Sequence, residues 1–242
     1  MKCLIIFFCT LCLASSPTDS RAGFLDDLTK DLGVSAGQSS GLDNKTIVSG
    51  LKEALTTGTT NAVNTVSSQD GYYGNQMIKI LIPEKIRGVV DLVGKAGFQG
   101  QVDEFILTMN RAAEKAAPQA TEHFVAALKA MTFEDASKIL QGNNTAATEY
   151  FKQKTSDKIF SSFKPVVTSS MKETGVNSAY SQLTERVATI PFAGSIASFD
   201  LDQYVTTKAV DGLFLMIGEE ENKIRTNPAA RGTELLRKVF SK

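Results

Sequence analysis

Apolar residues recur at helical spacing along most of this chain, and that spacing constrains the fold more strongly than any other feature. After Asp43 they fall four or seven positions apart, as on one face of an α-helix. Met77–Pro83 is the one strand-like run, and strands do not alternate with helices as in a βαβ fold. The pattern predicts an all-α protein, a single multi-helix, bundle-like domain of about eight to ten helices with at most one short β-hairpin. The first stripe consists of Ile47, Leu51, Leu55, Ala62 and Val66.

Polar capping residues and prolines indicate where the predicted helices begin and end. Met77–Pro83 is expected to be extended, with Tyr72-Tyr73 as its candidate hairpin partner, and Pro83 suits the first turn of the next helix. Pro165 is expected to kink or divide a long helix, because its ring removes one backbone hydrogen bond. The expected N-caps are Asp43 or Asn44, Thr132, Asn144 or Thr145, Asn177 and Asp200, and Thr233 starts the last helix.

The amino-terminal residues have the features of a secretory signal peptide. A short basic start, Met1-Lys2, precedes the apolar run "CLIIFFCTLCLA", and small residues lead up to Ala22. We expect residues 1–22 to be a signal peptide cleaved after Ala22, followed by a flexible N-terminal arm over residues 23–42. Residues 43–242 would then form the helical domain of an exported protein, periplasmic or secreted.

The three cysteines, Cys3, Cys9 and Cys12, all lie in this leader. The mature chain would therefore have no disulfide, no thiol nucleophile and no cysteine metal site. A lipid-anchored cysteine is the competing interpretation, but Leu11 stands where a lipoprotein signal has a small residue. The formal net charge is zero, which argues against a nucleic-acid partner. No later apolar stretch is long enough for a transmembrane segment in the mature chain.

Several blocks of sequence occur together in an order that is similar to a known family. They are "GLKEAL", "DGYYGN", "FILTMNRAAEKAAP", "YFKQKTSDKI" and "YVTTKAVDGLFLMIGEEENKIRTNPAARGTELLRKVF". Together they resemble the bacterial family labelled domain of unknown function 4197, over about Leu42 to Phe240. The resemblance implies an exported, helical bacterial protein without an established activity, and it supplies no catalytic residue.

The usual signatures of metal sites and nucleophilic catalysis are missing from the sequence. The only histidine, His123, is adjacent to Glu122, so the two side chains leave different sides of a helix. There is no Gly-x-Ser-x-Gly elbow and no Gly-rich phosphate loop. The tetrapeptide Ser161–Lys164 has Ser-x-x-Lys spacing, but its partner motifs are absent. We therefore expect no metal and no cofactor.

The stretch Asp211–Arg231 contains three consecutive glutamates after an apolar run. Leu213, Met216, Ile217 and Ile224 form one helical stripe, and Glu220 occupies the missing position in it. Glu219 and Glu221 are rotated about 100° to either side, so they are expected to reach solvent. Glu220 would be the buried carboxylate, and it would need an arginine partner.

Further polar residues lie close to predicted apolar stripes. Asn110 is at the edge of one stripe, and Arg111 and Glu114 are one turn apart. Lys208 is within reach of Tyr204 and Asp211 on its own helix. A structural polar network, a ligand-binding pocket and a catalytic cluster all remain open for these residues. The complete candidate set is Glu220, Arg111, Glu114, Asn110, Tyr204, Lys208, Asp211, Arg225 and Arg231, and Arg111, Arg225 and Arg231 are the candidate partners of Glu220.

These features favour a non-enzymatic, exported helical protein that binds an apolar small molecule or an envelope partner protein. The apolar segment Ile190–Phe199 has no helical period, so it would act as a lid or a contact surface. One alternative is a hydrolase-like enzyme that uses Glu220, Glu114 and an arginine. Another is a structural component of the cell envelope.

Overall fold

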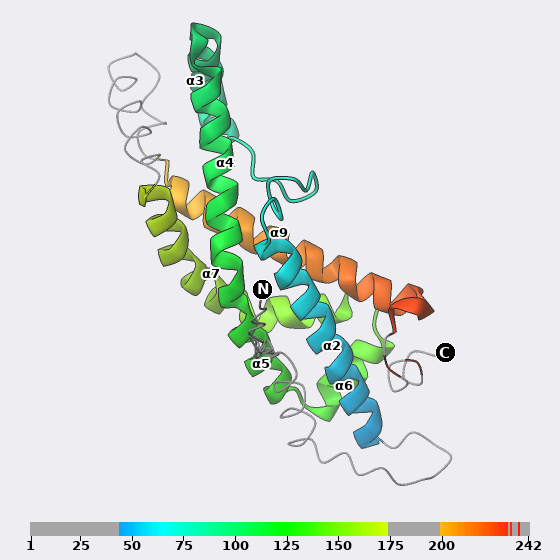
Figure 1. Ribbon diagram of the computed structural model, residues 1–242. Helices are drawn as coiled ribbons and strands as arrows, with labels where there is room; N and C mark the ends of the chain where they lie inside the picture. The colour runs from blue at the N-terminus through cyan, green and yellow to red at the C-terminus, as the bar shows by residue number, and fades with distance from the viewer. Residues whose placement is uncertain (1–43, 174–198, 232, 234–236, 238–242) are drawn as a thin grey trace, which may run out of the picture. The chain divides into compact units, whose positions relative to one another are not determined.

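The computed structural model describes residues 44–173, 199–231, 233 and 237 of the chain. These residues belong to one compact unit, Leu42–Lys242. Within the described ranges every regular element is a helix and none is a strand, so the predicted all-α class is confirmed (Figure 1). The helix with Asn177 as its cap and most of the apolar segment Ile190–Phe199 lie outside the described residues.

The helices follow one another with short connections. Three short helical turns, η1 (Gly94–Phe98), η2 (Ala117–Gln119) and η3 (Pro228–Ala230), join or follow the longer ones. The α-helices are α2 (Asn44–Ser67), α3 (Glu84–Val93), α4 (Gln99–Ala116), α5 (Ala120–Ala130), α6 (Phe133–Gln141), α7 (Ala146–Glu173) and α9 (Leu201–Thr226).

Helix ends follow the predicted capping residues closely. Thr132 and Asp135 form a reciprocal capping box at the start of α6. The Asp200 carboxylate accepts the Gln203 N–H at 2.8 Å and caps α9. Pro165 lies inside α7, which is assigned as one helix from Ala146 to Glu173, so the proline does not divide it.

Helix α9 lies at the centre of the helical packing. It contacts α7, α2 and α4, so apolar residues on several of its sides are buried (Figure 1). The Phe124 ring of α5 meets the Phe151 ring of α7 edge-on at 5.3 Å and the Phe214 ring of α9 at 6.1 Å. These edge-to-face contacts join three helices in the main core.

The segment between α2 and α3 is held by side chains, not by a second strand. The Asn110 amide accepts the Ile80 N–H at 2.8 Å and donates to the Ile80 carbonyl at 2.9 Å. This pair of bonds replaces the neighbour that a β-strand would supply. The hairpin considered for Met77–Pro83 is therefore absent from the described part of the chain. The segment reaches α9 at Gly212, where an added Cβ would lie 2.8 Å from the Tyr72 ring.

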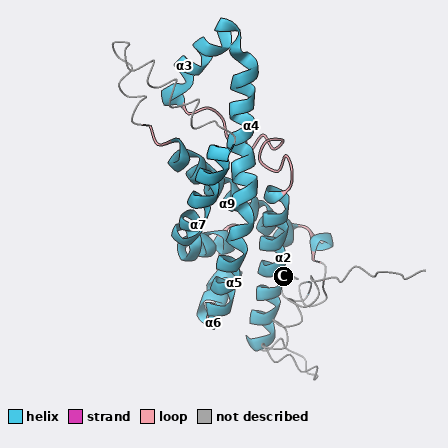
Figure 2. Cartoon of the chain, turned by 60° about the vertical axis from the view of Figure 1, so that its left-hand side comes forward, coloured by secondary structure: helices cyan, strands magenta, loops and turns pink. Residues whose placement is uncertain are grey.

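Helices α3 and α4 form a hairpin that extends beyond the main core. Gly97 has a φ of 96°, which only glycine adopts readily, and it turns the chain between the two helices. A separate small cluster of Ile86, Val90 and Val102 holds the hairpin together. Figure 2 shows the α3–α4 turn at the end of the helices opposite α6.

Candidate functional site

Glu221 is the buried carboxylate of the glutamate run, and it binds the first turn of α7. Its two oxygens accept the Ala147 N–H at 2.9 Å and the Thr148 N–H at 2.8 Å. The Thr148 hydroxyl donates a further bond at 2.8 Å, and the Arg225 guanidinium donates to the same carboxylate at 3.0 Å. The first N–H groups of a helix have no partner within it, so Glu221 caps α7 from another helix.

The prediction that Glu220 is the buried member is wrong. The Glu220 side chain is 14% exposed, against 5% for Glu221, and it accepts bonds from Lys223 at 2.6 Å and Asn61 at 3.4 Å. The expectation that Glu221 reaches solvent is also wrong. The reason is that α9 is covered by α2 on one side and by α7 on another, so two neighbouring stripes are buried and not one.

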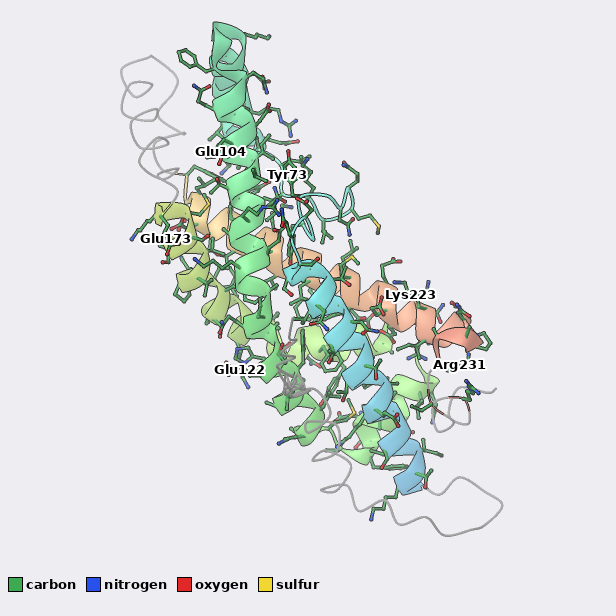
Figure 3. The ribbon with its side chains drawn as sticks, viewed as in Figure 1. Tyr73, Glu104, Glu122, Glu173, Lys223 and Arg231 are labelled. Atoms are coloured by element: carbon green, nitrogen blue, oxygen red, sulfur yellow. The ribbon has the colours of Figure 1, made fainter. Side chains whose placement is uncertain are left out.

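The arginines that were expected to pair with Glu220 have other partners. Arg225 pairs with Glu221 and also donates to the Ile139 carbonyl at 2.8 Å. Arg231 donates to the carbonyls of Ile224 at 3.0 Å and Arg225 at 2.8 Å. Those carbonyls belong to the last turn of α9, where a cation is favourable. Figure 3 shows Arg231 and Lys223 at this end of the helix.

Arg111 and Glu114 form the second polar cluster, as the one-turn spacing predicted. The Arg111 guanidinium donates to Glu114 at 2.6 Å and to Asp70 at 2.7 Å. The other Glu114 oxygen accepts the N–H groups of Tyr72 at 3.1 Å and Tyr73 at 3.2 Å. Glu114 therefore fixes the turn after α2 against α4, and its partners are different from those of Glu220.

Both polar clusters are satisfied internally. Among the described residues, every buried side-chain nitrogen or oxygen has a hydrogen-bond partner. A saturated network of this kind positions helices and does not leave an acceptor free for a ligand. The structural interpretation of Glu114 and Glu221 is thus the one that their contacts support.

His123 and Ser162 form a pair that the sequence did not reveal. The His123 Nε2 atom lies 2.8 Å from the Ser162 hydroxyl, and the Glu122 carboxylate lies 3.5 Å from that same nitrogen. In a catalytic triad the carboxylate binds the opposite ring nitrogen, so this arrangement is not a triad. The described residues also hold no group of three or more histidine or acidic side chains arranged around a metal position.

A surface pocket of about 440 Å³ lies between Met77–Arg87 and α9. Three large apolar side chains on its border are unusually open to solvent: Met77 is 60% exposed, Leu81 54% and Leu215 40%. The lining also includes Lys79, Glu84 and Arg87 from the first segment and Tyr204, Lys208 and Asp211 from α9.

Tyr204 organises this pocket. Its hydroxyl donates to the Leu81 carbonyl at 3.0 Å, and its ring packs on Phe199 at 5.8 Å. The Lys208 ammonium lies 5.9 Å from the Tyr204 ring centroid. Burial raises the pKa of the Tyr204 hydroxyl, and the charge of Arg87 offsets part of that effect. Tyr204 therefore remains a neutral donor at physiological pH.

The family of the chain follows from a comparison with family models. The model described as "Protein of unknown function (DUF4197)" matches residues 41–241. The chain belongs to the DUF4197 family. The resemblance noted in the sequence is thereby confirmed, while comparisons with curated proteins and with solved structures found no match.

In the structure of this DUF4197 chain, the predicted site residues lie at four separate positions and do not form one site. Tyr204, Lys208 and Asp211 lie together at the α9 pocket. The remaining candidates lie elsewhere: Asn110, Arg111 and Glu114 hold the turn after α2, Arg225 and Arg231 lie at the end of α9, and Glu220 faces α2.

Sequence reasoning missed the pocket's other half, because Lys79 and Leu81 come from a segment without helical periodicity and no pattern in the sequence places Arg87 beside α9. None of the described helices of this DUF4197 chain is long and apolar enough to cross a lipid bilayer.

Proposed function

We propose that this DUF4197 protein is a non-enzymatic, exported binding protein, and that the α9 pocket receives an amphiphilic ligand with an apolar body and an anionic head group. The observation that carries the proposal is that one pocket brings exposed apolar side chains together with cations that have no described carboxylate within 4.0 Å. The leader at residues 1–22 supports export.

The size and lining of the pocket suit a small amphiphile. Its volume of about 440 Å³ is within the range of small-molecule sites, roughly 300–1,000 Å³. Met77, Leu81 and Leu215 offer an apolar wall, and exposing them together costs solvation free energy unless something covers them. A ligand with an apolar body would remove that surface from water.

The charges at the pocket favour an anionic head group. Lys79, Arg87 and Lys208 line it, and in the described part of the chain none of these cations lies within 4.0 Å of a carboxylate. Glu84 and Asp211 also line it, which leaves three cations against two carboxylates. An anion gains from this excess, and a cationic head group would meet repulsion.

The catalytic alternative has less support. A hydrolase would need Glu220, Glu114 and an arginine to act on one substrate. Glu114 is saturated by Arg111 and two backbone N–H groups, and Glu220 binds Lys223 and Asn61 on other elements. Neither glutamate lines the α9 pocket.

The test compares three probes that share one alkyl chain: dodecanoate, dodecanol and dodecylammonium, each below its critical micelle concentration. Titration calorimetry with the purified protein should give the tightest binding for dodecanoate and the weakest for dodecylammonium. Leu215→Ser should weaken dodecanoate binding about tenfold, since burying such a side chain contributes roughly 1.5–3 kcal/mol. Lys208→Gln should reduce the preference for dodecanoate over dodecanol.

Two matched controls accompany these variants. Phe133→Ser removes another exposed apolar side chain, and Lys152→Gln removes an exposed lysine on α7, both outside the pocket. Neither should change dodecanoate binding. Equal affinity for all three probes, or unchanged binding by Leu215→Ser, would rule the proposal out and favour an envelope partner protein or a structural role.

A further inference from the structure

The turn between α3 and α4 exposes a second set of large apolar side chains. Leu92, near the end of α3, is 67% exposed, and Phe98, the last residue of η1, is 51% exposed. Among the described residues, the large hydrophobic side chains exposed outside the α9 pocket are Leu92, Phe98 and Phe133. Such residues concentrated at one turn indicate a contact surface more strongly than the same residues scattered singly.

The turn between α3 and α4 carries almost no charge. Gly97 reverses the chain with its positive φ, and Gly94 and Gly100 flank it. From Asp91 to Gln101 the only charged side chains are Asp91 and Lys95, which have opposite signs. A partner that recognised this tip by charge would find no net charge to recognise.

The tip extends away from the main body of helices. The main packing partners of α3 are α4 and η1, and the hairpin has its own cluster of Ile86, Val90 and Val102. Both views place the α3–α4 turn at the far end of the helices from α6 (Figures 1 and 2). The α3–α4 turn can therefore contact a surface that the main body of helices does not touch.

The small area of the tip decides which occupant fits. One aromatic side chain buries about 150–250 Å² and a leucine is smaller, so Leu92 and Phe98 together supply less than about 500 Å². A standard protein–protein interface needs about 800 Å² on each partner, and a second copy of this chain would face the same shortfall. A lipid surface needs no complementary groove, because the acyl region accepts apolar side chains of any shape.

We propose that the α3–α4 tip, through Leu92 and Phe98, inserts into the interfacial layer of a lipid bilayer. Helix α3 then links the two apolar sites of the molecule, because Glu84 and Arg87 at its start line the α9 pocket. Its ten residues span about 15 Å. The insertion into the bilayer is argued from the α3–α4 turn alone. Its purpose, the transfer of an amphiphile between the bilayer and the α9 pocket, rests on the proposed function.

Flotation of the purified protein with vesicles of phosphatidylcholine tests the docking. Wild-type protein should float with these vesicles, with the same bound fraction at 0.05 and 0.5 M salt. Leu92→Ser/Phe98→Ser should reduce the partition coefficient at least about tenfold. Phe133→Ser, which removes a similarly exposed side chain elsewhere, should leave it unchanged. Far-ultraviolet circular dichroism confirms that each variant remains helical.

Four outcomes would overturn the proposal. They are no flotation of the wild type, undiminished flotation of the double variant, flotation only with anionic lipid at low salt, and a dimer in sedimentation velocity that the double variant loses. Dodecanoate binding separates the two proposals: the tip variant should bind dodecanoate as the wild type does, whereas Leu215→Ser should bind it about tenfold more weakly and still float.

Discussion

Glu221 shows how much one residue can contribute when its partners come from another helix. Its carboxylate accepts two N–H groups at the start of α7 and pairs with Arg225 in a buried setting. Glu221→Gln removes the negative charge that pairs with Arg225. We expect a loss of about 3 kcal/mol in the free energy of unfolding, measured by urea denaturation.

The neighbouring Glu220→Gln is the matched control for this change. Glu220 pairs with the exposed Lys223, and the loss of such a surface ion pair is expected to cost less than about 1 kcal/mol. A larger loss in Glu220→Gln than in Glu221→Gln would contradict the assignment of Glu221 as the buried carboxylate.

Tyr72 makes the stability of the protein sensitive to alkaline pH. Its side chain is fully buried, and its hydroxyl donates to the Ala209 carbonyl at 2.6 Å. Burial, with a smaller contribution from the Glu114 carboxylate, raises the pKa of this hydroxyl far above 10.0. The unfolded chain loses the proton near pH 10 while the folded chain keeps it, so stability is full below pH 10 and falls as pH rises above it.

Tyr72→Phe should therefore change stability in opposite ways at the two ends of this pH range. At pH 7 the variant loses one hydrogen bond and about 1 kcal/mol. Between pH 9 and pH 11 it should lose less stability than the wild type, because it has no proton to release at this position. Parallel urea titrations check this, and identical slopes with pH in both proteins would contradict it.

At the scale of the elements, the sequence predicted helix ends better than it predicted which faces are buried. Thr132 and Asp200 cap the helices they were expected to cap, because such caps depend on bonds three residues along the same chain. Pro165 was expected to kink or divide its helix, and α7 continues from Ala146 to Glu173, so the proline does not divide it.

The burial of Glu221 and the shape of Met77–Pro83 depend on contacts that sequence spacing does not encode. Helix α9 is covered by both α2 and α7, and a single stripe could not reveal that both sides are buried. Met77–Pro83 has the alternation of a strand, but Asn110 from α4 supplies the hydrogen bonds of the missing neighbour. The α9 pocket was half predicted, since Tyr204, Lys208 and Asp211 share one helix while its other wall comes from this segment.

At the scale of the molecule, the apolar residues fall into a large core and a smaller hairpin cluster. The large core joins α2, α4, α5, α7 and α9, whereas the cluster of Ile86, Val90 and Val102 packs α3 against α4. Partly buried Ile82, Phe105, Ile106 and Phe199 contact both clusters. A small cluster stabilises its element by less than a large core does. We therefore expect the amides of α3 to exchange with solvent deuterium by local opening, well before those of α7 and α9.

Ile86→Ala, at a side chain that is buried in the hairpin cluster, tests this division into two units. The substitution should cost about 2 kcal/mol or more within the hairpin, and so speed the exchange of α3 by about thirtyfold. Exchange in α7 and α9 should stay unchanged, because their opening does not depend on the hairpin. Leu128→Ala in the large core is the control and should lower protection throughout that core. If Ile86→Ala speeds exchange in every helix by the same factor, the hairpin is not a separate unit and opens only when the whole protein unfolds.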